Sequence, residues 1–170
     1  MTHVQNARPD RRSILGLGLG AAATAVTLPM LTAEPALAVS AADPVNDYPY
    51  KNSAVDQVDR WNFYTRECTS FVAWRLNRRN GISFNNYWRG VHWGNASNWI
   101  NAAQQAGLRV NRTPRVGAVG VPDGHGHVAW VNRVRADGRI SFEEYNWSPA
   151  YAYNHRRTAP SGWRYIHFPG

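Results

Sequence analysis

The sequence has one cysteine, one lysine and, after its first forty residues, no hydrophobic run long enough to span a bilayer. A lone cysteine excludes an intramolecular disulfide and the paired-cysteine spacings of structural zinc sites. Acidic residues are also few, with 11 Asp and Glu against 19 Lys and Arg. These shortages leave a basic chain that must fold around a hydrophobic core, and they make the unpaired thiol of Cys68 a candidate for reactivity.

Residues 1–38 are predicted to be an export signal rather than part of the fold. A pair of arginines, Arg11 and Arg12, precedes an uncharged stretch rich in Gly, Ala and Thr. This stretch is followed by Ala36-Leu37-Ala38, a small-residue pattern that signal peptidases cut after. The segment resembles a twin-arginine signal, with a Sec signal or a retained membrane anchor as the alternatives. We expect cleavage, a secreted product and no stable membrane insertion.

The 132 residues after this segment suit a single domain with one core. All 21 aromatic residues lie between Tyr48 and Phe168, so residues 39–47 are predicted to be a linker and residues 48–170 the folded domain. The domain and linker together carry sixteen Lys and Arg against nine Asp and Glu, a formal charge of +7. This excess favours an anionic partner, and charge alone leaves wall polymers, nucleic acid and acidic lipid open.

Hydrophobic periodicity predicts helices in the first half of the domain. One helix is expected over 67–79, because its apolar residues recur at the spacing of one helical face and Gly81 follows it. A second is expected over 97–106, with Asn95 or Ser97 as its cap.

Strand-like alternation follows, and it marks four segments: 116–121, 127–134, 139–146 and 163–168. Asp137-Gly138 is expected to join the second and third of these as a tight hairpin. Helices followed by an antiparallel sheet predict an α+β domain.

The expected helix places Cys68 in its first turn, where the partial positive charge of the helix N-terminus favours a thiolate. A nucleophilic cysteine needs a base, most often histidine, and a third group that orients the imidazole. His125 and His127 flank Gly126 at the start of a predicted strand, and their equal parity leaves both open as the base. The remaining histidines of the domain are interpreted as surface or structural residues: His92, His155 and His167.

The hairpin partner of this strand ends in "EEYN", and alternation separates its two glutamates. Glu144 and Asn146 share one face and can reach a histidine on the neighbouring strand, whereas Glu143 lies on the other face. A zinc site built on His-Gly-His is the competing interpretation, although no third ligand stands at a recognisable spacing.

Several motifs, in order, resemble the CHAP domain, the cysteine- and histidine-dependent amidohydrolase/peptidase family: "RECTSFVAWRLN", "WGNASNWINAAQQAG", "TPRVGAVGV", "GHVAWVNRVRADGRI" and "EEYNW". The resemblance runs from Tyr48 to Trp147 and implies a papain-like fold. It implies four catalytic residues: Cys68 as nucleophile, His127 as base, and Glu144 and Asn146 to complete the site. The resemblance, and not the periodicity, selects His127 over His125.

The family further implies a secreted, monomeric cell-wall hydrolase that cuts an amide bond of peptidoglycan. The bond is either the N-acetylmuramoyl-L-alanine link, cut by an amidase, or a peptide bond of the stem or cross-bridge, cut by an endopeptidase. Anionic wall polymers are the expected partners of the charge, with no nucleic acid and no cofactor. Calcium, which some members bind before the cysteine, is not expected, because that segment offers Asp59 and little else.

Two other functions use the same observations. The chain could be a non-catalytic wall-binding module in which Cys68 is incidental, or an antibacterial effector with the same chemistry. Four aromatic residues are candidates to line a groove, with core packing as the alternative: Trp61, Trp88, Trp93 and Tyr151. Trp147 either shields the site from water or belongs to the core.

Overall fold

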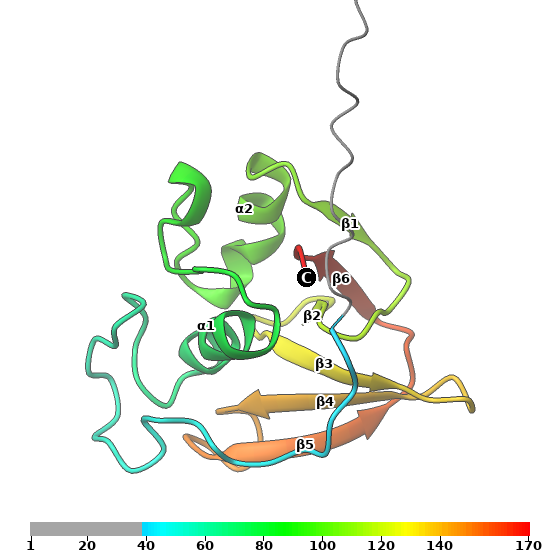
Figure 1. Ribbon diagram of the computed structural model, residues 1–170, viewed down its shortest axis with the longest axis horizontal. Helices are drawn as coiled ribbons and strands as arrows, with labels where there is room; N and C mark the ends of the chain where they lie inside the picture. The colour runs from blue at the N-terminus through cyan, green and yellow to red at the C-terminus, as the bar shows by residue number, and fades with distance from the viewer. Residues whose placement is uncertain (1–38) are drawn as a thin grey trace, which may run out of the picture. The chain divides into compact units, whose positions relative to one another are not determined.

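The computed structural model describes residues 39–170, so the predicted export signal lies outside the described residues. The domain is built on a six-stranded antiparallel sheet in the order β1-β6-β2-β3-β4-β5 (Figure 1). Its strands are β1 (Arg109–Asn111), β2 (Val119–Pro122), β3 (Ala129–Val134), β4 (Ile140–Tyr145), β5 (Tyr153–Thr158) and β6 (Trp163–His167). The predicted α+β class is therefore confirmed.

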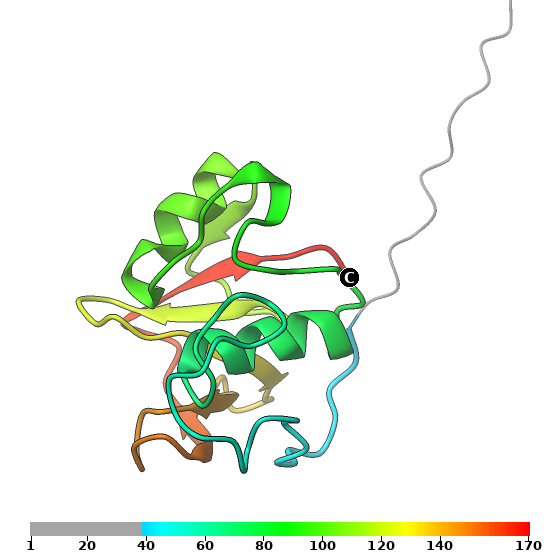
Figure 2. The same cartoon turned by 90° about the vertical axis from the view of Figure 1, so that its left-hand side faces the viewer.

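Both α-helices precede the sheet in the chain. Helix α1 (Cys68–Arg79) lies along β3 and β4, and α2 (Trp99–Gln105) packs beside β1 (Figure 2). Short 3-10 turns occupy Trp88–Gly90 and Ala96–Asn98. Among the described residues, no helix combines the length and apolar character needed to cross a membrane.

Helix α1 forms as its sequence predicts. Phe71, Val72 and Leu76 are fully buried in the core between the helices and the sheet. Glu67 has extended backbone at the N-cap, and the chain leaves the helix through Gly81 with φ +70°. The start of α1 is thus fixed at Cys68, the residue on which the site depends.

The second predicted helix is correct in position but not in its cap. A 3-10 turn comes first, so α2 begins at Trp99, and neither Asn95 nor Asn98 makes a side-chain cap bond at a helix start. Asn98 instead donates to the carbonyls of His92 and Trp93, holding the preceding loop against the turn.

Four strands confirm the predicted segments, and two strands were missed. The missed strands β1 and β5 lie at the two edges of the sheet. β1 has only three residues, and β5 reads "YNHRRT", a polar segment without apolar alternation. Charged, short edge strands protect a sheet from further pairing, and the same features remove the signal that predicts them.

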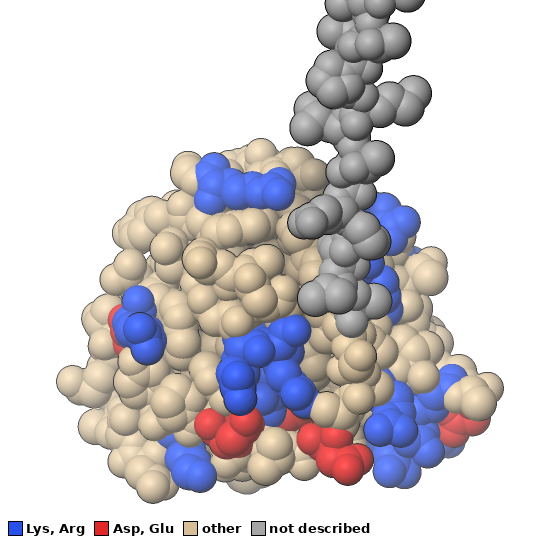
Figure 3. Space-filling model, in the orientation of Figure 1, with Lys and Arg blue, Asp and Glu red and all other residues tan. Residues whose placement is uncertain are grey.

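Basic side chains lie over the surface in separate groups, with few acidic neighbours on the face shown in Figure 3. Paired surface charges include Arg112 with Asp123 at 2.8 Å and Arg164 with the same carboxylate at 3.4 Å. Exposed pairs of this kind contribute little to stability. The surface charge is therefore available to an anionic partner.

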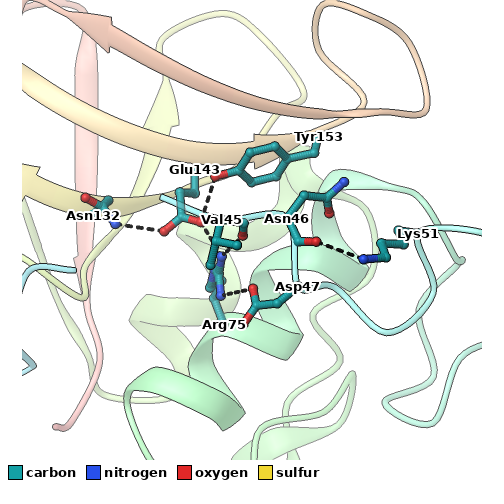
Figure 4. Close-up of polar contacts among 8 residues, drawn as sticks. All are labelled: Val45, Asn46, Asp47, Lys51, Arg75, Asn132, Glu143 and Tyr153. Carbon is teal, nitrogen blue, oxygen red and sulfur yellow. Dashed lines mark hydrogen bonds and ion pairs between the residues drawn. The ribbon is translucent and has the colours of Figure 1, made fainter. Parts of the chain in front are cut away.

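A buried ionic cluster joins α1 to the sheet (Figure 4). Arg75 of α1 pairs with Glu143 of β4, and both side chains are almost fully buried. Arg75 also bonds the Asp47 carboxylate at 3.0 Å and the Val45 carbonyl at 2.8 Å, so residues of the predicted linker contact the domain. Because removing one member of a buried pair leaves an uncompensated charge, this cluster fixes how α1 lies on β4.

The other oxygen of Glu143 is also satisfied. Asn132 donates to Glu143 at 2.8 Å, and Tyr153 of β5 donates to it at 2.9 Å. The register of β3 against β4 shifts between Val131 and Arg133, and a bulge of this kind re-aims a side chain, here Asn132, toward the cluster.

Candidate functional site

Cys68 lies where the start of α1 meets the approach to β3. Its side chain is 6% exposed, and backbone amides of Val128, Thr69 and Cys68 itself donate to the sulfur. The imidazole of His127 is not among these donors. Because Val128 follows His127 directly, the thiol is nevertheless held against the residue next to the predicted base.

The segment before α1 is fixed by Asp59. This carboxylate accepts the backbone N–H of Trp61 at 2.8 Å and of Phe63 at 2.9 Å, and it accepts the Ser70 hydroxyl. Burial raises the pKa of Asp59, and these hydrogen bonds work against the rise. Asp59 therefore organises the chain, and no cluster of three or more potential metal ligands occurs within residues 39–170.

His127 is bound to a buried carboxylate. Its Nε2 lies 2.9 Å from Glu144 Oε2, and the exposed fractions of the two side chains are 3% and 0%. Arg156 of β5 donates to both oxygens of Glu144, at 2.9 and 2.8 Å, and Asn154 donates to Oε1 at 3.0 Å. Burial works to raise the pKa of Glu144, but the hydrogen bonds and charges of His127 and Arg156 outweigh it, so the pKa is lowered.

An ionised Glu144 decides which nitrogen of His127 carries the proton. A carboxylate only accepts hydrogen bonds, so Nε2 must be the donor and Nδ1 keeps its lone pair. The arrangement leaves one nitrogen of a fixed ring able to accept a proton.

The structure distinguishes the two histidines that periodicity left open. His125 is exposed in the turn before β3, whereas His127 is buried and holds Glu144. The two side chains therefore do not share an environment.

Asn146 lies at the end of β4, where its φ of +53° turns the chain away from the strand. Its Nδ2 donates to Glu67 Oε2 at 2.8 Å, and its Oδ1 accepts the backbone N–H of Tyr151 at 2.8 Å. Asn146 thus connects the end of β4 to the residue before Cys68, and Glu144, not Asn146, contacts the imidazole.

Trp147 covers the His127 ring from outside rather than joining the core. It is 39% exposed, with ring centroids 4.6 Å apart, and the Arg156 guanidinium lies 5.2 Å from the Trp147 ring. Trp147 and Arg156 together shield the imidazole and its carboxylate from water. Sequence reasoning missed Arg156 and Asn154 because β5 was missed; their only signal is a pair of hydrogen-bond donors two residues apart.

The resting thiol differs from the expectation. Burial raises the pKa of Cys68 to about 12, and the neighbouring Glu67 charge adds to the rise. The amide donors at the helix start lower the pKa by less than burial raises it. The expectation that the helix start alone yields a thiolate is therefore wrong for the resting site, and the proton must be removed during attack.

Cys68 opens into a cavity of about 390 Å³, which it lines with Glu67, Tyr64, Ser97 and Gly126 among others. A larger cavity of about 600 Å³ adjoins it. The two cavities share three residues: Tyr64, Thr69 and Asn95.

The aromatic residues expected to line a groove mostly do not. Trp61 and Trp93 are buried in the core, and Trp88 packs against it. Tyr151 is 37% exposed, but it lines neither of the two cavities. Core packing explains the three tryptophans.

Comparison with known proteins places these features in a family. The model of the CHAP domain matches residues 58–146, just over half of the chain. Staphylococcal secretory antigen ssaA2 of Staphylococcus aureus is 36% identical over 113 residues, covering 62% of this chain and 39% of that protein. N-acetylmuramoyl-L-alanine amidase sle1 of Staphylococcus epidermidis is 37% identical over 115 residues, covering 62% and 33%.

A solved structure is also similar. The crystal structure of an N-acetylmuramoyl-L-alanine amidase from Staphylococcus aureus aligns with a TM-score of 0.51 and 30% identity, covering 61% of this chain and 30% of that one. The chain therefore spans well under half the length of each of these proteins.

The raised pKa of Cys68 predicts how its alkylation depends on pH. Since only the thiolate reacts, the rate with iodoacetamide should rise about tenfold per pH unit from about pH 7 to about pH 10. Urea-unfolded protein is the control, because its thiol should titrate near the ordinary value of about 8.5. Mass spectrometry measures the modified fraction. A rate in the folded protein that is independent of pH above about pH 6 would contradict a protonated resting thiol.

Proposed function

The chain belongs to the CHAP domain family, and from this premise we propose that it hydrolyses an amide bond of peptidoglycan with Cys68 as nucleophile and His127 as general base. The observation that carries the proposal is the fixed tautomer of His127. Glu144 holds Nε2, so the lone pair of Nδ1 is free to take a proton beside a buried thiol. The relatives named as amidases support the choice of an amide substrate.

The reaction proceeds through a thioester. His127 Nδ1 takes the proton of Cys68 as Sγ bonds to the amide carbonyl carbon, and the carbonyl oxygen becomes an oxyanion. The C–N bond then breaks as His127 returns the proton to the leaving nitrogen. A water molecule attacks the thioester, gives its proton to His127, and releases the acid and the thiol.

The start of α1 supplies a donor for the oxyanion. The Phe71 N–H is the first to bond within the helix, to the Glu67 carbonyl at 3.1 Å, which leaves the earlier N–H groups of α1 without intrahelical acceptors. The backbone N–H of Cys68 is the proposed oxyanion donor. Glu144 and Arg156 act as positioning residues, because they hold the ring and do not touch the substrate.

Secretion and charge complete the proposal. A secreted relative and the predicted export signal support action at the cell wall. The arginine-rich surface supports attraction to anionic wall polymers, so hydrolysis of whole walls should fall as salt rises from about 50 mM to about 0.5 M, where the screening length shortens to a few ångström. Unchanged hydrolysis over this range would contradict attraction by charge.

Mass spectrometry of fragments released from purified peptidoglycan tests the proposed reaction. The wild-type protein should release new amino termini without new reducing sugars. Cys68→Ala and His127→Gln should each lower the rate by at least about 1,000-fold, because nucleophile and base act as one unit. His125→Gln is the matched control and should retain activity, since His125 is exposed and does not contact Glu144. Full activity of Cys68→Ala would contradict the thiol mechanism.

A further inference from the structure

We propose that the cavity of about 600 Å³ beside Cys68 is a saccharide subsite, and that it directs hydrolysis to the amide between the lactyl group of N-acetylmuramic acid and L-alanine. This inference rests on the proposed function and deepens it. The volume lies within the range of natural small-molecule sites, about 300–1,000 Å³.

The first argument is position. The saccharide cavity and the Cys68 cavity share Tyr64, Thr69 and Asn95, and Thr69 directly follows the nucleophile. In peptidoglycan, the amide nearest to a sugar ring is the one on the lactyl group. A ring held in this cavity therefore brings that amide to Cys68, whereas bonds within the stem would lie further along the peptide.

The second argument is the absence of charge in the lining. The described part of the chain is strongly basic, yet no Asp, Glu, Lys or Arg lines the saccharide cavity. The stem peptide carries carboxylates and amines, which an uncharged site would desolvate without a partner. An amide-linked muramyl residue and its N-acetylglucosamine neighbour carry no charge and match the lining.

The third argument is the combination of exposed rings and amides. Tyr64 and Tyr87 are 55% and 59% exposed, although both are large aromatic side chains that cost free energy when hydrated. The Tyr87 and His92 rings are stacked at 5.2 Å with 20° between their planes, forming a flat platform. Sugar rings present apolar C–H faces to such platforms and hydroxyl and acetamido groups to amides such as Asn62.

The wall of this cavity is already held in place. Asn86 donates to the Asn62 carbonyl at 2.8 Å and accepts the Gly94 N–H at 2.7 Å. The two segments that carry the rings are thus joined before any ligand enters, and a preformed site loses less conformational entropy on binding.

Binding is tested on the Cys68→Ala protein, which cannot turn over. Titration with N-acetylglucosaminyl-N-acetylmuramic acid, followed by NMR, should give saturable shifts of the Asn62 and Asn86 side-chain amides. Tyr87→Ala in this background should weaken binding at least about tenfold, and Tyr87→Phe should restore it because the ring face is kept. Val134→Ala, a similarly exposed apolar side chain on β3, is the control and should bind as the parent does. Absence of saturable shifts, or equal affinity for Tyr87→Ala, would overturn the subsite.

The choice of bond is tested with two substrates, a disaccharide-peptide and the same peptide without sugars. The wild-type protein should free the L-alanine amino terminus of the first and leave the second intact, and Tyr87→Ala should raise KM at least about tenfold with a smaller change in kcat. Cleavage inside the sugar-free peptide at an equal rate would overturn the inference and leave the hydrolase proposal standing. Saccharide binding without any hydrolysis would do the reverse.

Discussion

Two consecutive glutamates of β4 are the constraint on which the structure depends. Successive side chains of a strand point to opposite faces, so Glu143 and Glu144 are directed to different layers. Glu143 pairs with Arg75 and fixes α1, and Glu144 holds His127 with help from Arg156. Both carboxylates are fully buried, and neither could stay ionised there without its own cation and donors. One strand thereby positions the thiol from one face and its base from the other.

This construction explains why a buried, protonated thiol is compatible with the proposed catalysis. A thiolate buried without a cation would be costly, and the free lone pair of His127 removes the need to store one. The ring is held by Glu144 and covered by Trp147, so its orientation is set before substrate binds. What the site lacks at rest is an ion pair, and the proton moves only when the amide is in place.

Much of the fold follows from local patterns that the sequence displays openly. The apolar face of α1, the glycine after it and the alternation of β3 and β4 predict where Cys68, His127 and Glu144 stand. Selection of His127 over His125 needed the family resemblance, because both positions have the same parity.

Other features depend on tertiary contacts that no local pattern encodes. Arg156 acts through an edge strand that carries no apolar periodicity, and Asn146 turns away because its backbone leaves the strand. The degree of burial, which dominates the pKa of Cys68, exists only once the helix is packed. Likewise, Tyr64 and Tyr87 line the cavity beside the thiol because two distant segments meet through Asn86.

The division of labour between the two glutamates is tested most directly by measuring stability and kcat together for Glu143→Gln and Glu144→Gln. The account predicts that Glu143→Gln loses about 3–5 kcal/mol of unfolding free energy, while its folded fraction keeps kcat within about threefold. It predicts that Glu144→Gln loses less stability, about 1–2 kcal/mol, since Arg156 reaches solvent, but that kcat falls at least about 100-fold. Undiminished kcat in Glu144→Gln, or an equal loss in both folded variants, would contradict it.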